Sequence, residues 1–79
     1  MTASNIIPLS LARPGSLVRI IHVQGGRGAF KRLFELGIIP GETVRVVFND
    51  AGPVVVERGG TRFAIGRGLA AKILVEVVG

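Results

Sequence analysis

Several short runs of mostly apolar residues recur along the chain, and the segments that separate them contain glycine or proline. The runs are rich in Val, Ile and Leu, which favour strands, and they cover residues 17–23, 44–48, 54–58, 61–65 and 73–77. The segments between them carry Pro-Gly, Gly-Gly and Asn-Asp-Ala-Gly-Pro, which are sequences that reverse a chain within a few residues. The pattern therefore predicts a mainly β fold of about five strands.

One stretch departs from the strand pattern. Residues 29–36 carry apolar side chains at the spacing of an α-helix, at Phe30, Leu33 and Phe34. A helix of about eight residues does not persist alone in water, so we expect all three side chains to be buried against the strands. Gly37 stands where a left-handed C-terminal cap is needed, and glycine adopts that conformation without cost.

The ends of the pattern complete the predicted architecture. Residues 1–8 are expected to run along the surface or to form a flexible N-terminal arm, and residues 9–11 to supply a short first pairing segment. Residues 66–71 indicate a single helical turn before the last strand. A helix after the first long strand and a helical turn before the last are typical of a small SH3-like barrel. We find no repeat and no linker, so residues 1–79 are expected to form a single domain.

The composition of the chain bears on where in the cell the protein is expected to work. The hydrophobic content is 48% and cysteine is absent, so no disulfide and no thiolate ligand is available. The N-terminus shows no signal-peptide pattern, and no apolar run approaches the roughly 18 residues of a membrane helix. A soluble cytoplasmic protein is the expectation.

The charge balance points to acidic partners. Ten Lys and Arg residues against five Asp and Glu give a net charge of +5, which favours nucleic acid, an anionic membrane or an acidic protein surface. The basic residues are scattered along the chain, and Tyr and Trp, the usual stacking platforms for bases, are absent. We therefore expect no nucleic acid, and an acidic protein surface instead.

No constellation in the sequence predicts catalysis. His22 is the only histidine and lies within a predicted strand, and the five carboxylates are isolated from one another. The glycine-rich segment 25–28 lacks the Lys-Ser/Thr ending of a phosphate-binding loop, so we interpret it as a flexible corner between strand and helix. We predict no enzyme, no cofactor and no metal site within one chain. A transition-metal site between chains, using His22 or a surface glutamate, stays open.

Three motifs in order resemble the FeoA family, whose members accompany a bacterial ferrous-iron transporter. They are Leu9-x-Leu11 with Pro14-Gly15; Arg32-Leu33-x-Glu35-Leu36-Gly37-x-x-Pro40-Gly41-x-x-Val44; and Gly52-Pro53-Val54 followed by Ala64-Ile65-Gly66 and Ala70-Ala71-x-Ile73-x-Val75. The resemblance covers roughly residues 9–78. Members often carry Arg where Gly66 stands, and charged residues where Gly68 and Leu69 stand, so the turn before the last strand is less polar here.

The resemblance implies a non-enzymatic accessory or regulatory protein of ferrous-iron uptake. Its partner would be the cytosolic, GTP-hydrolysing part of a FeoB-type Fe(II) transporter, so the chain would meet the membrane only through that transporter. The expected docking residues come from the predicted helix and from one turn, and they are Arg27, Lys31, Arg32, Glu35, Asp50 and Pro53. Exposed strand edges leave room for self-association.

Two other functions fit the same sequence. One is a basic SH3-like barrel that binds nucleic acid. The other is a free-standing relative of the C-terminal domain of metal-dependent repressors, which also carry an SH3-like domain. The sequence does not distinguish activation of the transporter from its restraint.

Overall fold

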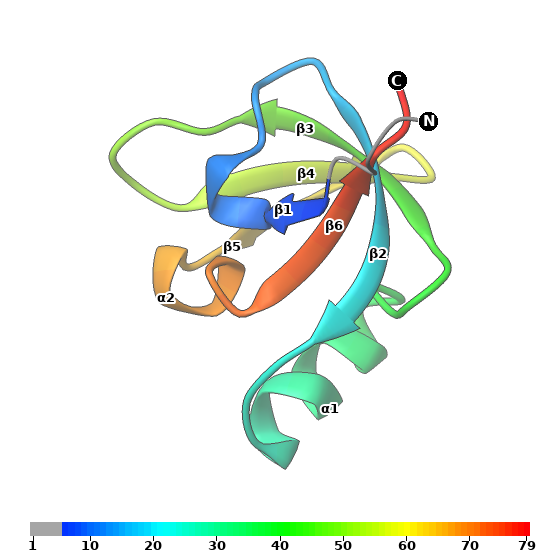
Figure 1. Cartoon of the computed structure of the whole chain (residues 1–79), viewed down its shortest axis with the longest axis vertical. Helices are drawn as coiled ribbons and strands as arrows, with labels where there is room; N and C mark the ends of the chain where they lie inside the picture. The colour runs from blue at the N-terminus through cyan, green and yellow to red at the C-terminus, as the bar shows by residue number, and fades with distance from the viewer. Residues whose placement is uncertain (1–5) are drawn as a thin grey trace.

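The structure, a computed structural model, describes residues 6–79 (Figure 1). One antiparallel sheet of six strands runs in the order β1-β6-β2-β3-β4-β5. The strands are β1 (Ile6–Pro8), β2 (Leu17–Val23), β3 (Thr43–Phe48), β4 (Val54–Arg58), β5 (Thr61–Ile65) and β6 (Ile73–Val77). The sheet is strongly curled, and its inner face encloses the core (Figure 1). The predicted mainly β, SH3-like architecture is confirmed, with one more strand than expected.

Strict alternation along the central strands builds this core. Val18 and Ile20 on β2 are buried, and so are Val44 and Val46 on the neighbouring β3. The other strands contribute the remaining strand residues of the core, which are Val54, Val56, Ile65, Ile73 and Val75. Because side chains on a strand alternate between faces, the positions between them are more exposed and are free to carry charge.

The first residues of the described chain differ from expectation. Residues 6–8 form β1, which pairs with β6 through Ile7 opposite Val75; residues 1–5, the rest of the predicted arm, lie outside the described residues. The predicted pairing segment is instead a 3-10 helix, η1 (Leu9–Leu11). Pro8 has no N–H to donate to a ladder, so pairing ends there and the chain coils, which places Leu9 in the core.

The predicted helix is present as α1 (Arg27–Glu35), and it ends as expected at Gly37, whose φ is +78°. The Ile38 N–H donates to the Leu33 carbonyl (2.8 Å) and the Gly37 N–H to the Phe34 carbonyl (3.0 Å). These two bonds form a Schellman motif. Leu33 and Ile38 are both fully buried, so the C-terminal end of α1 is the end that the barrel holds.

The prediction that Phe30 and Phe34 are buried is wrong. The two residues are 44% and 58% exposed. The reason is geometric, because α1 projects from one end of the barrel and does not lie along it (Figure 1). Only Leu33 on α1 is fully buried. Helical spacing correctly grouped the three apolar residues, but the barrel covers only a narrow strip of the helix.

The predicted helical turn before the last strand is confirmed as α2 (Arg67–Ala70), with Ala70 buried. No helix in the described part of the chain is long and apolar enough to span a membrane.

Candidate docking surfaces

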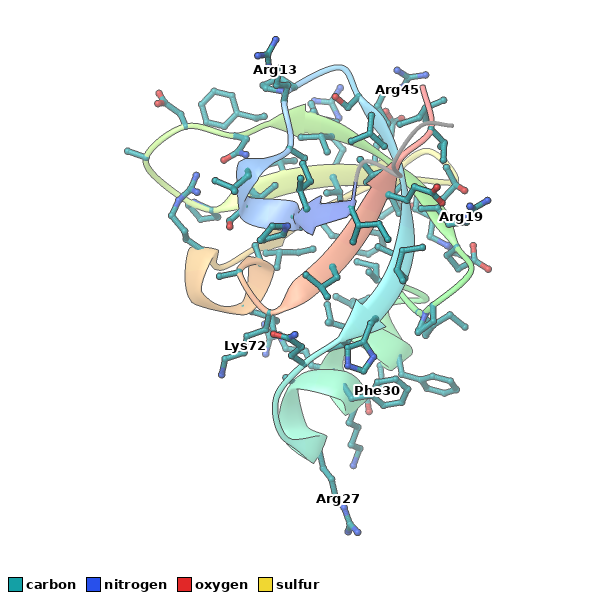
Figure 2. The ribbon with its side chains drawn as sticks, viewed as in Figure 1. Arg13, Arg19, Arg27, Phe30, Arg45 and Lys72 are labelled. Carbon is teal, nitrogen blue, oxygen red and sulfur yellow. The ribbon has the colours of Figure 1, made fainter. Side chains whose placement is uncertain are left out.

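Four of the six predicted docking residues lie together on α1. Arg27, Lys31 and Glu35 are four residues apart and form one row along the helix, while Arg32 lies on the flank. All four are exposed. Arg27 points away from the barrel at the free end of α1, whereas the labelled Arg13 and Arg45 lie at the opposite end of the molecule and Arg19 lies on its side (Figure 2).

The other two predicted docking residues lie elsewhere. Asp50 and Pro53 are exposed in the connection between β3 and β4. That connection is well separated from α1 in Figure 1. The structure therefore does not join the six residues into one patch, and a partner that covers α1 need not touch the β3–β4 connection.

Side-chain hydrogen bonds hold the β3–β4 connection in place, and no sequence pattern indicated them. The Arg67 side chain donates to the Gly52 carbonyl (3.3 Å) and the Ser10 carbonyl (3.2 Å), and it also bonds the Asn49 side chain and the Asp50 carbonyl. The Asn49 amide in turn donates to the carbonyls of Ser10 (3.0 Å) and Ala12 (2.7 Å). Arg67 and Asn49 thus tie α2, η1 and this connection together.

The α1 surface also carries two aromatic rings that sequence reasoning had assigned to the core. The rings of Phe30 and Phe34 stack with centroids 6.0 Å apart and an interplanar angle of 27°. Phe30 is three residues from Arg27, and Phe34 is three residues from Lys31, so each ring neighbours a cation on the helix surface. The exposed side of α1 is therefore both aromatic and basic.

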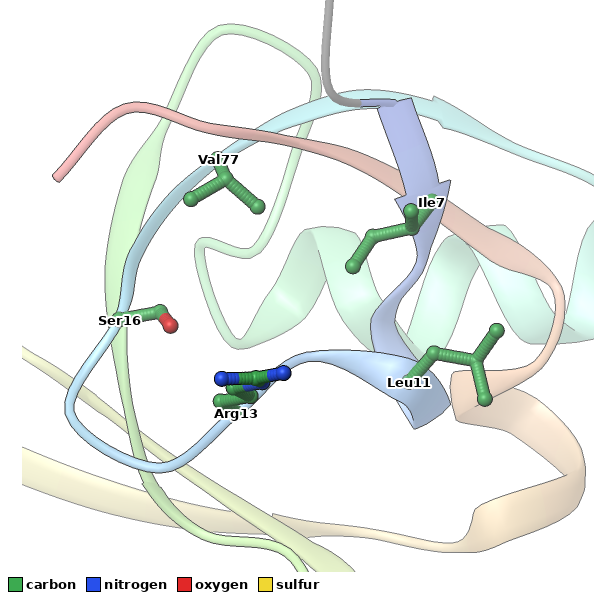
Figure 3. Close-up of a pocket in the computed structure, with 5 residues that line it drawn as sticks. All are labelled: Ile7, Leu11, Arg13, Ser16 and Val77. Carbon is green, nitrogen blue, oxygen red and sulfur yellow. The ribbon is translucent and has the colours of Figure 1, made fainter.

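A separate hollow lies on the side of the barrel (Figure 3). Its volume is about 480 Å³, and it is lined by Ile7, Leu11, Arg13, Ser16 and Val77. Leu11 is 67% exposed, which makes it the most exposed large apolar residue of the described chain. Its apolar lining residues come from β1, η1 and β6, and Arg13 is the one cation among its lining residues.

The carboxylates do not gather. Glu42 forms an ion pair with Arg58 (3.2 Å), and Glu76 forms one with Arg19. Among residues 6–79, no three His, Asp or Glu side chains lie close enough to hold a metal ion. His22 is exposed beside a β-bulge in β2, and its imidazole has no carboxylate hydrogen-bonded to it within the described chain.

Comparisons with known proteins agree with this geometry. The family model of the FeoA domain matches residues 7–77. The putative Fe(2+) transport protein A of Methanocaldococcus jannaschii is 44% identical over 69 residues, which cover 87% of this chain and 84% of that protein. The crystal structure of an iron uptake regulatory protein (FeoA) superposes with a TM-score of 0.87 at 36% identity, covering 92% of this chain and 99% of the other.

A further likeness shows the fold alone. A manganese-dependent transcriptional repressor superposes with a TM-score of 0.85, but at 17% identity; the match covers 99% of this chain and 45% of the repressor. The FeoA crystal structure is more similar than the repressor in sequence, and the match covers nearly all of that FeoA chain but less than half of the repressor. Since the FeoA family model spans nearly all of the described residues and a putative Fe(2+) transport protein A is 44% identical over most of the chain, the chain belongs to the FeoA family.

Proposed function

We propose that this protein is a non-enzymatic accessory protein of ferrous-iron uptake that docks on the cytosolic part of a FeoB-type transporter. The family and the M. jannaschii relative support a role in Fe(2+) transport. The observation that carries the docking role is α1, a helix that projects from the barrel with exposed cations and exposed aromatic rings.

The arrangement of the polar side chains supports a role without catalysis. General acid–base catalysis needs a positioned group and a partner that tunes or orients it. Two of the five carboxylates are engaged by arginines, and the only histidine is exposed on a strand. These features support a protein that acts by contact with its transporter and not by a reaction of its own.

The charges on α1 suit a docking element. Arg27, Lys31 and Arg32 are exposed on α1, and Glu35 is the only carboxylate on it. Such an uneven charge speeds encounter with an acidic surface and sets the orientation of the complex. The protein would work in the cytoplasm, and it would reach the membrane only through the transporter.

Retention on the full-length transporter tests this proposal. The transporter is reconstituted in nanodiscs of zwitterionic lipid, and the protein, its Arg27→Glu/Lys31→Glu variant and an Arg13→Glu/Arg62→Glu variant are each passed over it. The two double variants change the net charge equally. We expect wild type and the Arg13→Glu/Arg62→Glu control to be retained and the helix variant to be released at lower salt. Equal retention of the two variants would remove α1 as the docking element, and no retention of wild type would overturn the proposal.

A further inference from the structure

The side of α1 that carries Arg27, Phe30, Lys31 and Phe34, called here the α1 face, has a composition that stability does not require. Phe30 and Phe34 are outside the core cluster, and about half of the surface of each is exposed. The helix is held instead by Leu33 and by the two hydrogen bonds that cap its C-terminal end. We therefore interpret the two stacked phenylalanines at the surface of this nine-residue helix as a binding surface for another molecule.

The chemistry of the α1 face defines that partner. Burial of the stacked aromatic rings in an apolar recess is favourable. The cations three residues away, Arg27 and Lys31, would pair best with carboxylates at the rim of that recess. A second copy of the chain is a poor occupant because each copy carries a net charge of +5 and would bring cations against cations.

Glu35 decides between a protein and a lipid surface. It is exposed and lies in the same row as Arg27 and Lys31. A plane of anionic headgroups would repel it, whereas a protein groove can place a cation or a backbone N–H opposite it. A helix that projects from its barrel, as α1 does (Figure 1), can also enter a groove without a clash from the strands.

We infer that the α1 face enters an apolar groove rimmed by carboxylates on the cytosolic part of the transporter, with Phe30 and Phe34 as its anchors. This inference rests on the proposed function and names the chemistry of its partner. Anchors of this kind carry most of the affinity of an interface, and the charged residues around them contribute orientation and rate.

The test compares phenylalanines at two places. Affinity for the full-length transporter in zwitterionic nanodiscs is measured for wild type, for Phe30→Ser/Phe34→Ser and for Phe48→Ser. Phe48 is a matched control because it is 53% exposed and lies at the end of β3. We expect the double variant to bind roughly thirtyfold or more weakly, and Phe48→Ser to bind like wild type. Thermal melting of each variant establishes that it is folded, and Phe34→Ser alone serves if the double variant is not.

The possible outcomes distinguish a failure of this inference from a failure of the proposed function on which it rests. If wild type binds and the folded double variant binds equally well, the inference is overturned and the proposed function survives. If wild type does not bind the transporter, the proposed function is overturned and the inference falls with it. Empty nanodiscs that contain anionic phospholipid form a third arm. If wild type binds these as tightly as the transporter, and serine at positions 30 and 34 abolishes that binding, the α1 face recognises lipid and the groove is overturned.

Discussion

The barrel and α1 use their apolar residues in opposite ways. On β4 and β6, burial alternates along runs of consecutive apolar residues, and the inward-facing Val54, Val56, Ile73 and Val75 are fully buried. On α1, three large apolar residues share one side, yet only Leu33 is buried. The comparison shows that a periodic pattern tells which residues share a side of an element, whereas burial depends on how much of that side the rest of the protein covers.

The largest expected effect on stability is at Leu33, the residue through which α1 packs into the core of the barrel. Leu33→Ala should lower the free energy of unfolding by about 2–5 kcal/mol, because it leaves a cavity where α1 enters the core. Urea unfolding followed by circular dichroism measures it. A variant as stable as wild type would mean that the barrel does not depend on its contact with α1.

The next effect tests how the β3–β4 connection is held. Asn49→Ala removes the hydrogen bonds from the Asn49 amide to the carbonyls of Ser10 and Ala12. The Ser10 carbonyl keeps its bond from Arg67, whereas the Ala12 carbonyl loses its side-chain donor, and a partly buried acceptor left without its donor costs about 1–3 kcal/mol. Asn49→Asp is the matched variant, since it keeps the size and loses the donor. If both variants unfold at the urea concentration of wild type, Arg67 alone suffices to brace the connection.

A backbone effect of about 1–2 kcal/mol is expected at the end of α1. Gly37 has φ +78°, which costs other L-residues about that much, and a Cβ there would lie 2.8 Å from Arg58 Nη1. Gly37→Ala should therefore destabilise the protein. Gly28→Ala, within α1 and with open space around it, should instead stabilise it by about 0.5–1 kcal/mol. If Gly28→Ala also destabilised the protein, the loss at Gly37 could not be attributed to the left-handed conformation of the cap alone.

The smallest effect on stability is expected at the exposed ring. Phe34→Ala should change the free energy of unfolding by only about 0.5 kcal/mol, as surface substitutions do, beside the loss of several kcal/mol predicted for Leu33→Ala. Parallel urea titrations of the two variants measure the contrast. A loss at Phe34 as large as the one at Leu33 would show that α1 lies against the barrel in solution.

Local patterns allowed much of the fold to be predicted. The bounds of β4, β5 and β6 agree with the predicted runs, because the two sides of each strand differ in burial and glycine marks the turns. Gly37 was found because its position after the helix demands a left-handed conformation. These features depend on neighbours in sequence, which is the information that periodicity contains.

The features that were missed depend on residues distant in sequence. η1 replaced the expected pairing segment because β6, at the other end of the chain, pairs with residues 6–8. The hydrogen bonds of Arg67 to residues 10, 49, 50 and 52 could not be inferred from an arginine that looked like one of several scattered cations. The exposure of Phe30 and Phe34 likewise depends on the direction in which α1 leaves the barrel.

The six docking residues predicted from the sequence do not share one surface. The four α1 residues share one exposed element, as helical spacing requires. Asp50 and Pro53 are exposed, but they belong to a different region of the surface. The two phenylalanines that we now place at the centre of the interface were assigned to the core, because apolar residues at helical spacing usually do face the interior.

Amide hydrogen exchange tests the central claim, that α1 is the docking element, most directly. Exchange is followed in the full chain alone, with the transporter in zwitterionic nanodiscs, and with empty nanodiscs of the same lipid. We predict that the transporter slows exchange in residues 27–36, that the β4–β5 hairpin is unchanged, and that empty discs have no effect. Unchanged exchange in α1 while the transporter is bound, or slowing confined to the hollow around Ile7, Leu11 and Val77, would contradict the account.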